Sequence, residues 1–192
     1  MSERYEMRMS GTGGQGLIMA GILLAEAAIR DGKNAIQTQS YGPESRGGAS
    51  KSEVVISDTE ILYPKATSID LCLAVSQEAY DKYHKALKPD GILIIDPFYV
   101  LKTEPGEKAI PLAFAQTARE KLGREVVANV IACGAIAEIT QRVTLTSLEK
   151  SLYGRVPKGT EEKNRQALAL GAELARGWKR ACAESMAAEQ PA

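Results

Sequence analysis

The feature that most constrains this chain is a glycine-rich hexapeptide, Gly11-Thr12-Gly13-Gly14-Gln15-Gly16. The segment before it, Tyr5 to Ser10, alternates apolar and polar residues and predicts a strand. The segment after it, Leu17 to Arg30, is apolar almost all round and predicts a buried helix that ends at Asp31-Gly32. Glycines so placed permit a tight turn and let a phosphate approach the N-terminus of a helix. The hexapeptide therefore predicts the strand–turn–helix unit of a Rossmann-like fold.

The rest of the chain alternates strands and helices before it becomes mostly helical. Strands are predicted at Asn34–Tyr41, Ala49–Ser57, Leu71–Val75 and Ile92–Ile95. A turn is predicted at Lys88–Gly91, and helices at Gln77–Leu87, Phe114–Leu122, Val127–Thr140, Leu145–Leu152 and Glu162–Glu189. This alternation is typical of an α/β fold, so we expect a Rossmann-like, doubly wound, mostly parallel sheet with a helical C-terminal part. We take residues 1–192 as one domain, with the last helix, about 161–189, as a candidate interface.

Charge and cysteine content argue against several kinds of site. The 24 basic and 24 acidic residues give no net charge, whereas nucleic-acid binding leaves a basic footprint. Cys72, Cys133 and Cys182 lie far apart, so the chain lacks the four clustered thiolates of an iron–sulfur site, and we expect reduced core cysteines. We also expect no signal core and no membrane span, because the longest apolar stretch is too short. These features predict a cytoplasmic protein without a metal site.

The hexapeptide alone leaves three interpretations open. A dinucleotide site would also need an acidic residue at the end of the second strand, and Asn34–Tyr41 contains neither Asp nor Glu. That makes a stand-alone nicotinamide-dependent oxidoreductase the weakest interpretation. In the second interpretation the glycines only permit a turn and close helix–strand packing. In the third, the loop binds a phosphate-bearing ligand other than a nicotinamide nucleotide.

A second glycine-containing loop helps to decide between these three interpretations. It reads Ser40-Tyr41-Gly42-Pro43-Glu44-Ser45-Arg46-Gly47-Gly48, and a string of this length rarely recurs by chance. Together with the hexapeptide it resembles the gamma subunit, or gamma domain, of 2-oxoacid:ferredoxin oxidoreductases. Downstream segments are similar to that family too: Ala49–Val54, Asp70–Val75, Leu87–Gly91, Asn129–Gly134, and Asn164 with Ala167 and Gly171. The resemblance extends from about Met7 to Gly171.

The resemblance implies one subunit of an enzyme that converts a 2-oxoacid, coenzyme A and oxidised ferredoxin to acyl-CoA, carbon dioxide and reduced ferredoxin. It implies alpha and beta partners, with a delta subunit as a further candidate, and ferredoxin contact only through the complex. Thiamine diphosphate and iron–sulfur clusters are implied on those partners, so the isolated chain is expected to be inactive. Tyr41–Ser45 favours the 2-oxoglutarate, 2-oxoisovalerate or pyruvate enzymes, and a short separate subunit favours the first. The alternatives are the small subunit of indolepyruvate ferredoxin oxidoreductase and a structural module without a ligand.

Coenzyme A is the candidate ligand that the resemblance suggests for this chain. The candidate binding residues are Gly11, Gly13, Gly14, Gln15, Gly16, Tyr41, Glu44, Ser45, Arg46, Gly47, Gly48 and Lys51. The planar guanidinium of Arg46 suits a phosphate or carboxylate, although an ion pair with Glu44 or Glu53 is as good an interpretation. Lys51 is either a second phosphate-binding charge or a solvated side chain. Gln15 either contacts the ligand or hydrogen-bonds its own loop.

Three residues outside the loops carry further expectations. His84, the only histidine, is expected on the surface of a helix. Asp96 ends a strand, where carboxylates bind ligands in open parallel sheets, but a turn with Pro97 is the favoured interpretation. Trp178 lies on an apolar face of the last helix, and it either packs against the domain or anchors a subunit interface.

Overall fold

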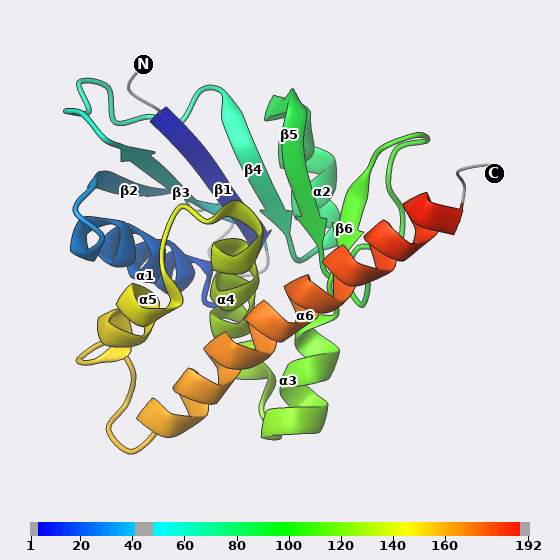
Figure 1. Cartoon of the computed structure of the whole chain (residues 1–192). Coiled ribbons are helices and arrows are strands. Elements are labelled where there is room, and N and C mark those ends of the chain that lie inside the picture. The colour runs from blue at the N-terminus through cyan, green and yellow to red at the C-terminus, as the bar shows by residue number, and fades with distance from the viewer. Residues whose placement is uncertain (1–3, 41–47, 189–192) are drawn as a thin grey trace.

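The computed structural model describes residues 4–40 and 48–188 and contains a six-stranded mixed sheet. Its strands are β1 (Arg4–Thr12), β2 (Asn34–Ser40), β3 (Ala49–Ser57), β4 (Ile69–Ala74), β5 (Leu87–Ile95) and β6 (Ala109–Pro111). They are arranged in the order β2-β3-β1-β4-β5-β6 (Figure 1). β1, β4, β5 and β6 pair in parallel, whereas β3 is antiparallel to both of its neighbours. The predicted α/β class is confirmed, with β3 as the reversed strand of the sheet.

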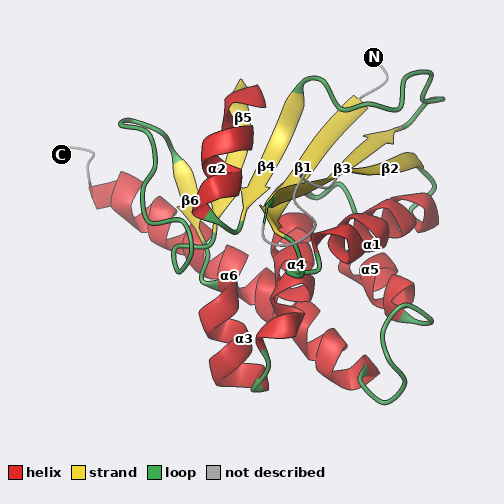
Figure 2. Ribbon diagram, turned by 180° about the vertical axis from the view of Figure 1, so that it is seen from behind, coloured by secondary structure: helices red, strands yellow, loops and turns green. Residues whose placement is uncertain are grey.

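Helices cover both faces of this sheet, but unequally. The helices are α1 (Leu17–Arg30), α2 (Gln77–Tyr83), α3 (Phe114–Leu122), α4 (Ala128–Thr140), α5 (Leu145–Leu152) and α6 (Glu161–Ala188). α2 lies on one face, and the other five helices form the layer on the opposite face (Figure 2). A strand covered on both faces directs successive side chains to opposite layers, and β4 does so. Leu71 and Leu73 join the core beneath α1 and α4. Cys72 and Ala74 join the smaller core beneath α2 instead.

Two predicted elements differ from the structure. The turn predicted at Lys88–Gly91 lies inside β5. Along β4 the pairing partner moves from Leu87, opposite Ile69, to Ile92, opposite Leu71, so the extra residues form an irregularity in the strand. The helix predicted to reach Leu87 ends its α-helical part at Tyr83 and continues as the 3₁₀ turn η1 (His84–Ala86). Proline and glycine in this segment suggested a turn, but pairing with β4 keeps it in the sheet.

The expectation that His84 lies on the surface is wrong. Its side chain is buried and stacks on the ring of Tyr80, with ring centroids 4.2 Å apart. Nδ1 lies 2.6 Å from the Tyr80 carbonyl oxygen, and because that oxygen can only accept, Nδ1–H donates. His84 therefore closes the end of α2 against its own preceding turn.

The cysteines are free, and two of the three are core residues as expected. Burial raises the pKa of the Cys72 thiol to about 11 and that of the Cys133 thiol to about 12. Cys182 is only half-buried on α6. The buried thiols are therefore neutral near pH 7 and pack as small apolar groups.

α6 is the longest helix and crosses the whole helical layer. It spans 28 residues, and its C-terminal end projects beyond β6 (Figure 1). Ala172 and Ala175 are buried, and Trp178 is half-buried against the main core. Trp178 therefore packs against its own domain. Within residues 4–40 and 48–188, no helix has the length and apolar character needed to cross a bilayer.

α4 and α6 are in direct backbone contact at two glycines. A Cβ on Gly134 would lie 2.1 Å from the Leu168 carbonyl oxygen, and a Cβ on Gly171 would lie 1.8 Å from that of Ile131. Neither approach is possible for a real side chain, so the crossing requires glycine at both positions. This contact fixes α4, which in turn supports the glycine loop described below.

We predict that Gly171→Ala lowers the free energy of unfolding by about 1–3 kcal/mol, because the added methyl group forces the two backbones apart. Gly177→Ala on the same helix is the matched control, since its Cβ would have no neighbour closer than 4.0 Å. That control should stabilise by up to about 1 kcal/mol through helix propensity. Urea denaturation followed by circular dichroism measures both, and equal effects would contradict the packing described here.

Candidate functional site

The glycine loop leaves the carboxyl end of β1 and leads directly into α1. Gly14 and Gly16 have φ angles of 96° and 73°, in the left-handed region that favours glycine. A Cβ on Gly11 would lie 2.4 Å from Gln15 Oε1, so the loop closes tightly on itself. Within residues 4–40 and 48–188, a Cβ on Gly13 or Gly14 would meet no atom within 4 Å. No described side chain caps α1, which leaves its first backbone N–H groups available to an anion.

Two side-chain amides hold this loop in place. Gln15 Oε1 accepts from Thr12 N at 2.6 Å, and Gln15 Nε2 donates to the Val75 carbonyl at 2.8 Å. Asn129, at the start of α4, donates from Nδ2 to the Gly16 carbonyl at 3.0 Å. Gln15 therefore hydrogen-bonds its own loop, as one of its two interpretations predicted. The loop is joined on one side to β4 and on the other to α4.

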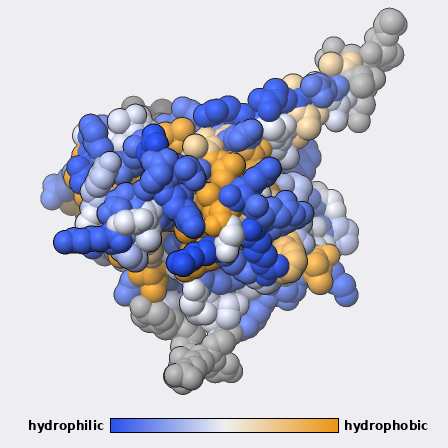
Figure 3. Space-filling view, turned by 90° about the horizontal axis from the view of Figure 1, so that it is seen from below, coloured by the Kyte–Doolittle hydropathy of each residue, from blue (hydrophilic) through white to orange (hydrophobic). Residues whose placement is uncertain are grey.

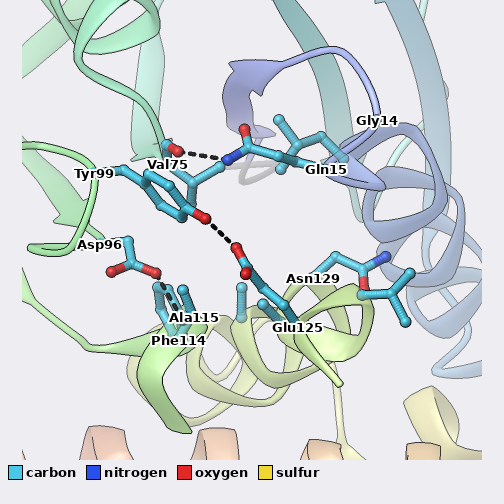
Figure 4. A pocket seen from close by; sticks show the side chains of 13 residues that line it. Gly14, Gln15, Val75, Asp96, Tyr99, Phe114, Ala115, Glu125 and Asn129 are labelled. Carbon is cyan, nitrogen blue, oxygen red and sulfur yellow. Dashed lines mark hydrogen bonds between the residues drawn. The ribbon is translucent and has the colours of Figure 1, made fainter. Parts of the chain in front are cut away.

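A cavity of about 210 Å³ opens between the loop and the carboxyl ends of β4 and β5 (Figure 4). This is the edge of an open α/β sheet at which ligands bind. Its walls come from the glycine loop, from the segments after β4 and β5, and from the starts of α3 and α4. The lining residues are Gly14, Gln15, Leu17, Val75, Asp96, Tyr99, Phe114, Ala115, Glu125, Val126, Ala128, Asn129 and Ala132.

Asp96 lies in the wall of this cavity but is occupied by backbone donors. Its Oδ1 accepts from Phe98 N at 3.0 Å, and its Oδ2 accepts from Ala115 N at 2.8 Å. Burial raises the pKa of this carboxyl, although the two backbone bonds oppose the shift. The interpretation of Asp96 as a turn residue is therefore supported. It also fixes the first turn of α3.

Tyr99, Glu125 and Arg119 form a latch on the outer wall of the cavity. The Tyr99 hydroxyl donates to Glu125 Oε1 (Figure 4), and Arg119 Nε donates to Glu125 Oε2 at 2.8 Å. The hydrogen bond from Tyr99, followed by that from Arg119, holds the pKa of the Glu125 carboxyl below its ordinary value. The latch joins the loop after β5 to the 3₁₀ turn η2 (Glu125–Val127).

A second cavity, of about 300 Å³, lies on the other side of η2. Val126 and Asn129 line both cavities, and Gly16 lines the second. Three cationic side chains, Arg124, Arg155 and Lys163, also line it. Arg155 is paired with Glu26, whereas neither Arg124 nor Lys163 has an ion pair within the described part of the chain. On the face seen from below in Figure 3, hydrophobic residues form a central strip bordered by hydrophilic ones.

The second loop lies largely outside the described residues: Tyr41, Glu44, Ser45, Arg46 and Gly47 are among the residues that the structure does not describe. Its two flanks are described. Ser40 at the end of β2 pairs with Lys51, and Ala49, which follows Gly48, pairs with Thr12 of the glycine loop strand. The second loop therefore leaves and rejoins the sheet at the edge where the hexapeptide lies.

Lys51 has a specific partner. Its Nζ lies 2.8 Å from Glu53 Oε1, and Arg8 Nη2 lies 2.6 Å from the same oxygen. Arg8 and Glu53 are both buried, so this is an internal ion-pair network between β1 and β3. Lys51 is accordingly held near the sheet edge by its charge partner.

Sequence reasoning did not find the latch or the cationic residues Arg124, Arg155 and Lys163 of the second cavity. Tyr99, Arg119 and Glu125 lie in different segments, and no spacing rule connects them. Asn129 entered only through the family resemblance, and nothing in its local sequence indicated a bond to Gly16. Among the described residues, no group of three His, Cys, Asp or Glu side chains is placed to hold a metal ion.

This fold and site define an α/β domain with a glycine loop at the carboxyl edge of its sheet, and comparison with known proteins gives its family. The family model for pyruvate ferredoxin/flavodoxin oxidoreductase matches residues 6–174. The chain belongs to that family. The 2-oxoglutarate synthase subunit KorC of Methanocaldococcus jannaschii is 46% identical over 177 residues, covering 90% of this chain and 95% of that protein.

Solved structures agree with this assignment. The keto/oxoacid ferredoxin oxidoreductase gamma subunit of Geobacter sulfurreducens is 48% identical, with a TM-score of 0.83, and the match covers 91% of this chain and 98% of that one. The 2-oxoglutarate:ferredoxin oxidoreductase of Magnetococcus marinus shares the fold with a TM-score of 0.82 at 24% identity. That match covers 91% of this chain but 31% of the longer chain. The predicted relation to gamma subunits of 2-oxoacid:ferredoxin oxidoreductases is confirmed.

We predict that Tyr99→Phe raises the pKa of Glu125 towards its ordinary value, because the hydrogen bond that contributes most to lowering this pKa is lost. A carboxyl whose pKa is lowered on folding stabilises the folded state at pH values above its pKa in the unfolded chain. This contribution is lost as the pH falls through the pKa of the folded state. The variant should therefore lose less stability on acidification than the wild type. Carbon-13 NMR titration of the Glu125 carboxyl measures the shift, and an unchanged titration would contradict the latch.

Proposed function

We propose that this chain is the gamma subunit of a 2-oxoglutarate:ferredoxin oxidoreductase and that its glycine-loop edge contributes to binding coenzyme A. The substrate follows from the name of the Methanocaldococcus relative and its 46% identity. The coenzyme is suggested by the Magnetococcus structure, which contains 2-oxoglutarate, coenzyme A and succinyl-CoA. The observation in this chain that carries the proposal is an uncapped helix N-terminus beside two open glycines, flanked by two cavities.

Each part of this edge suits a part of coenzyme A. The phosphates are anions, and the N–H groups at the start of α1, which no described side chain caps, attract anions. Arg124 and Lys163 supply further positive charge at the second cavity. The walls there include Met19, Val127 and Val130, which suit the less polar parts of the ligand. The two cavities meet at Val126, so an elongated ligand has room on both sides of η2.

The second loop completes the proposed surface. Its flanks, Ser40 and Ala49, lie at this edge, so we assign the rest of the candidate set to it as well. That set is Tyr41, Glu44, Ser45, Arg46, Gly47 and Gly48. In this proposal Arg46 meets a phosphate of the coenzyme, and the loops together orient it towards a neighbouring subunit.

The reaction itself belongs to the complex. We assign thiamine diphosphate and the iron–sulfur clusters to alpha and beta partners, with a delta subunit as a further candidate, and ferredoxin contact to the assembled enzyme. This chain, one domain over residues 1–192, then supplies binding and interface contacts and is inactive when isolated. A cytoplasmic location accords with its free cysteines.

A purely structural role is the second candidate. One observation favours it: both polar atoms of Gln15 and the side-chain N–H of Asn129 already have protein partners. The loop is therefore held in its conformation without a ligand. The two candidates differ in whether charge at the loop affects coenzyme A.

We predict that Gly13→Asp raises the KM for coenzyme A of the assembled enzyme by about ten-fold or more, because a carboxylate then faces the phosphates. The described part of the chain leaves room for the new side chain, since a Cβ on Gly13 meets none of its atoms within 4 Å. Gly13→Asn, of the same shape without charge, is the control and should change KM little. Steady-state kinetics should show the KM for 2-oxoglutarate unchanged in both. Equal KM values for coenzyme A in the Gly13→Asp and Gly13→Asn enzymes would favour the purely structural role.

We also predict that Arg46→Ala weakens binding of coenzyme A to the assembled complex by about ten-fold or more, as loss of a charge-assisted phosphate contact does. Isothermal titration of wild type and variant measures the dissociation constant. Lys51→Ala is the comparison, because Lys51 pairs with Glu53 and should affect binding less. Unchanged affinity for Arg46→Ala would remove this residue from the site.

A further inference from the structure

The loop between β3 and β4, residues 58–68, is held firmly at the sheet edge opposite the glycine loop. The Arg4 guanidinium donates to the carbonyl oxygens of Tyr63 at 2.9 Å and Lys65 at 3.0 Å. Arg4 also pairs with Glu6 at 2.6 Å. Burying a carboxylate such as Glu6 is costly unless it is paired. Here that paired carboxylate supports the loop.

The C-terminal end of the loop, next to β4, is fixed by the Glu6 carboxylate. Glu6 Oε2 accepts from Thr67 N at 2.5 Å and from Ser68 N at 2.7 Å. Ala66 is buried, and Ile61 packs partly against the smaller core. The second half of the loop is therefore anchored by charge-assisted hydrogen bonds, and Ile61 adds an apolar contact directly before Leu62. Such a loop has little conformational freedom left to lose when it binds a partner.

This anchored loop presents two large apolar side chains to solvent. Leu62 is 86% exposed, the highest value among the large hydrophobic residues described, and its neighbour Tyr63 is 54% exposed. The backbone carbonyl of Tyr63 is one of the two that Arg4 holds, so the anchoring reaches the exposed pair itself. Exposed apolar groups on a preorganised support are typical of interaction surfaces, where a few such residues provide most of the binding energy.

The position of the loop separates it from the proposed coenzyme surface. Ser57, at the end of β3, pairs with Arg4 at the start of β1, whereas Ala49 pairs with Thr12 at the other end. Figure 1 shows the loop at the top of the sheet, close to the N-terminus, and the glycine loop at the opposite end of β1. Coenzyme A bound at the glycine loop therefore cannot account for Leu62 and Tyr63.

We propose that the Leu62-Tyr63 pair is a docking knob that inserts into an apolar pocket of a larger subunit of the same oxidoreductase. The proposal rests on the assignment of this chain as a subunit. The Magnetococcus chain contains this fold as 31% of its length, so in that enzyme the domain is part of a larger polypeptide. The Methanocaldococcus relative, 95% of whose length this chain covers, is named as a subunit, so we expect this domain to need a surface that binds other chains without a covalent link.

Co-expression of this chain with the tagged larger subunits tests the knob. Leu62→Ser and Tyr63→Ser should each lower the amount of this chain that co-purifies after dilution by at least about ten-fold, as for a hot-spot residue. Both side chains are exposed, so the melting temperature of the isolated chain should not change. Tyr153→Ser is the matched control, because Tyr153 is 64% exposed on another surface, and it should assemble like the wild type.

A second variant tests the anchoring. Arg4→Gln does not alter the side chains of Leu62 and Tyr63. It removes the guanidinium that donates to the carbonyl oxygens of residues 63 and 65. It should weaken assembly and speed hydrogen exchange at amides 62–65. The proposed docking role would be overturned if Leu62→Ser and Tyr63→Ser both assembled normally. It would also be overturned if Tyr153→Ser lost as much co-purification as they do. The proposal would also be overturned if the serine variants lost only self-association of this chain, because the partner would then be a second copy of the chain. Failure of the wild-type chain to co-purify would instead refute its assignment as a subunit.

Discussion

The close approach of α1 to the strands beneath it is the constraint on which the rest of the structure depends. A Cβ on Gly21 would lie 2.1 Å from Ser52 Oγ of β3, and one on Gly16 would lie 2.4 Å from Asn129 Nδ2. Glycine at these positions lets the helix lie against the sheet and against α4 at once. The N-terminus of α1 is thereby fixed at the carboxyl edge of β1, beside the two cavities, and no described side chain caps it.

The two ends of the sheet are held by different means. At the glycine-loop end, uncharged amides of Gln15 and Asn129 join the loop to β4 and α4 and leave the local positive potential of the helix intact. At the other end, the Arg4–Glu6 pair anchors a connecting loop. This arrangement gives one edge suited to an anionic ligand and another suited to a protein surface, as expected for a subunit that works inside a complex.

Much of the fold was predictable because its signals are local. The glycine loop after an alternating strand predicted α1 with its observed bounds, and the mostly helical sequence after Pro111 predicted α3 and α5 with theirs. Lys88–Gly91 was misassigned because turn-forming residues gave no sign of the long-range pairing with β4. His84 was misassigned because its stacking on Tyr80 depends on burial of α2. The hexapeptide half of the site was readable from sequence, but the Tyr99–Glu125–Arg119 latch was not, since it joins segments that only the fold brings together.

Hydrogen–deuterium exchange of the assembled enzyme, with and without coenzyme A, tests the central claim most directly. If the uncapped start of α1 binds the coenzyme phosphates, its addition should slow exchange at amides 13–20 and in the turn at residues 124–130. Amides 58–68, at the opposite edge, should be unaffected by the ligand. Protection confined to other subunits, with no change at the glycine loop, would show that this edge does not bind coenzyme A.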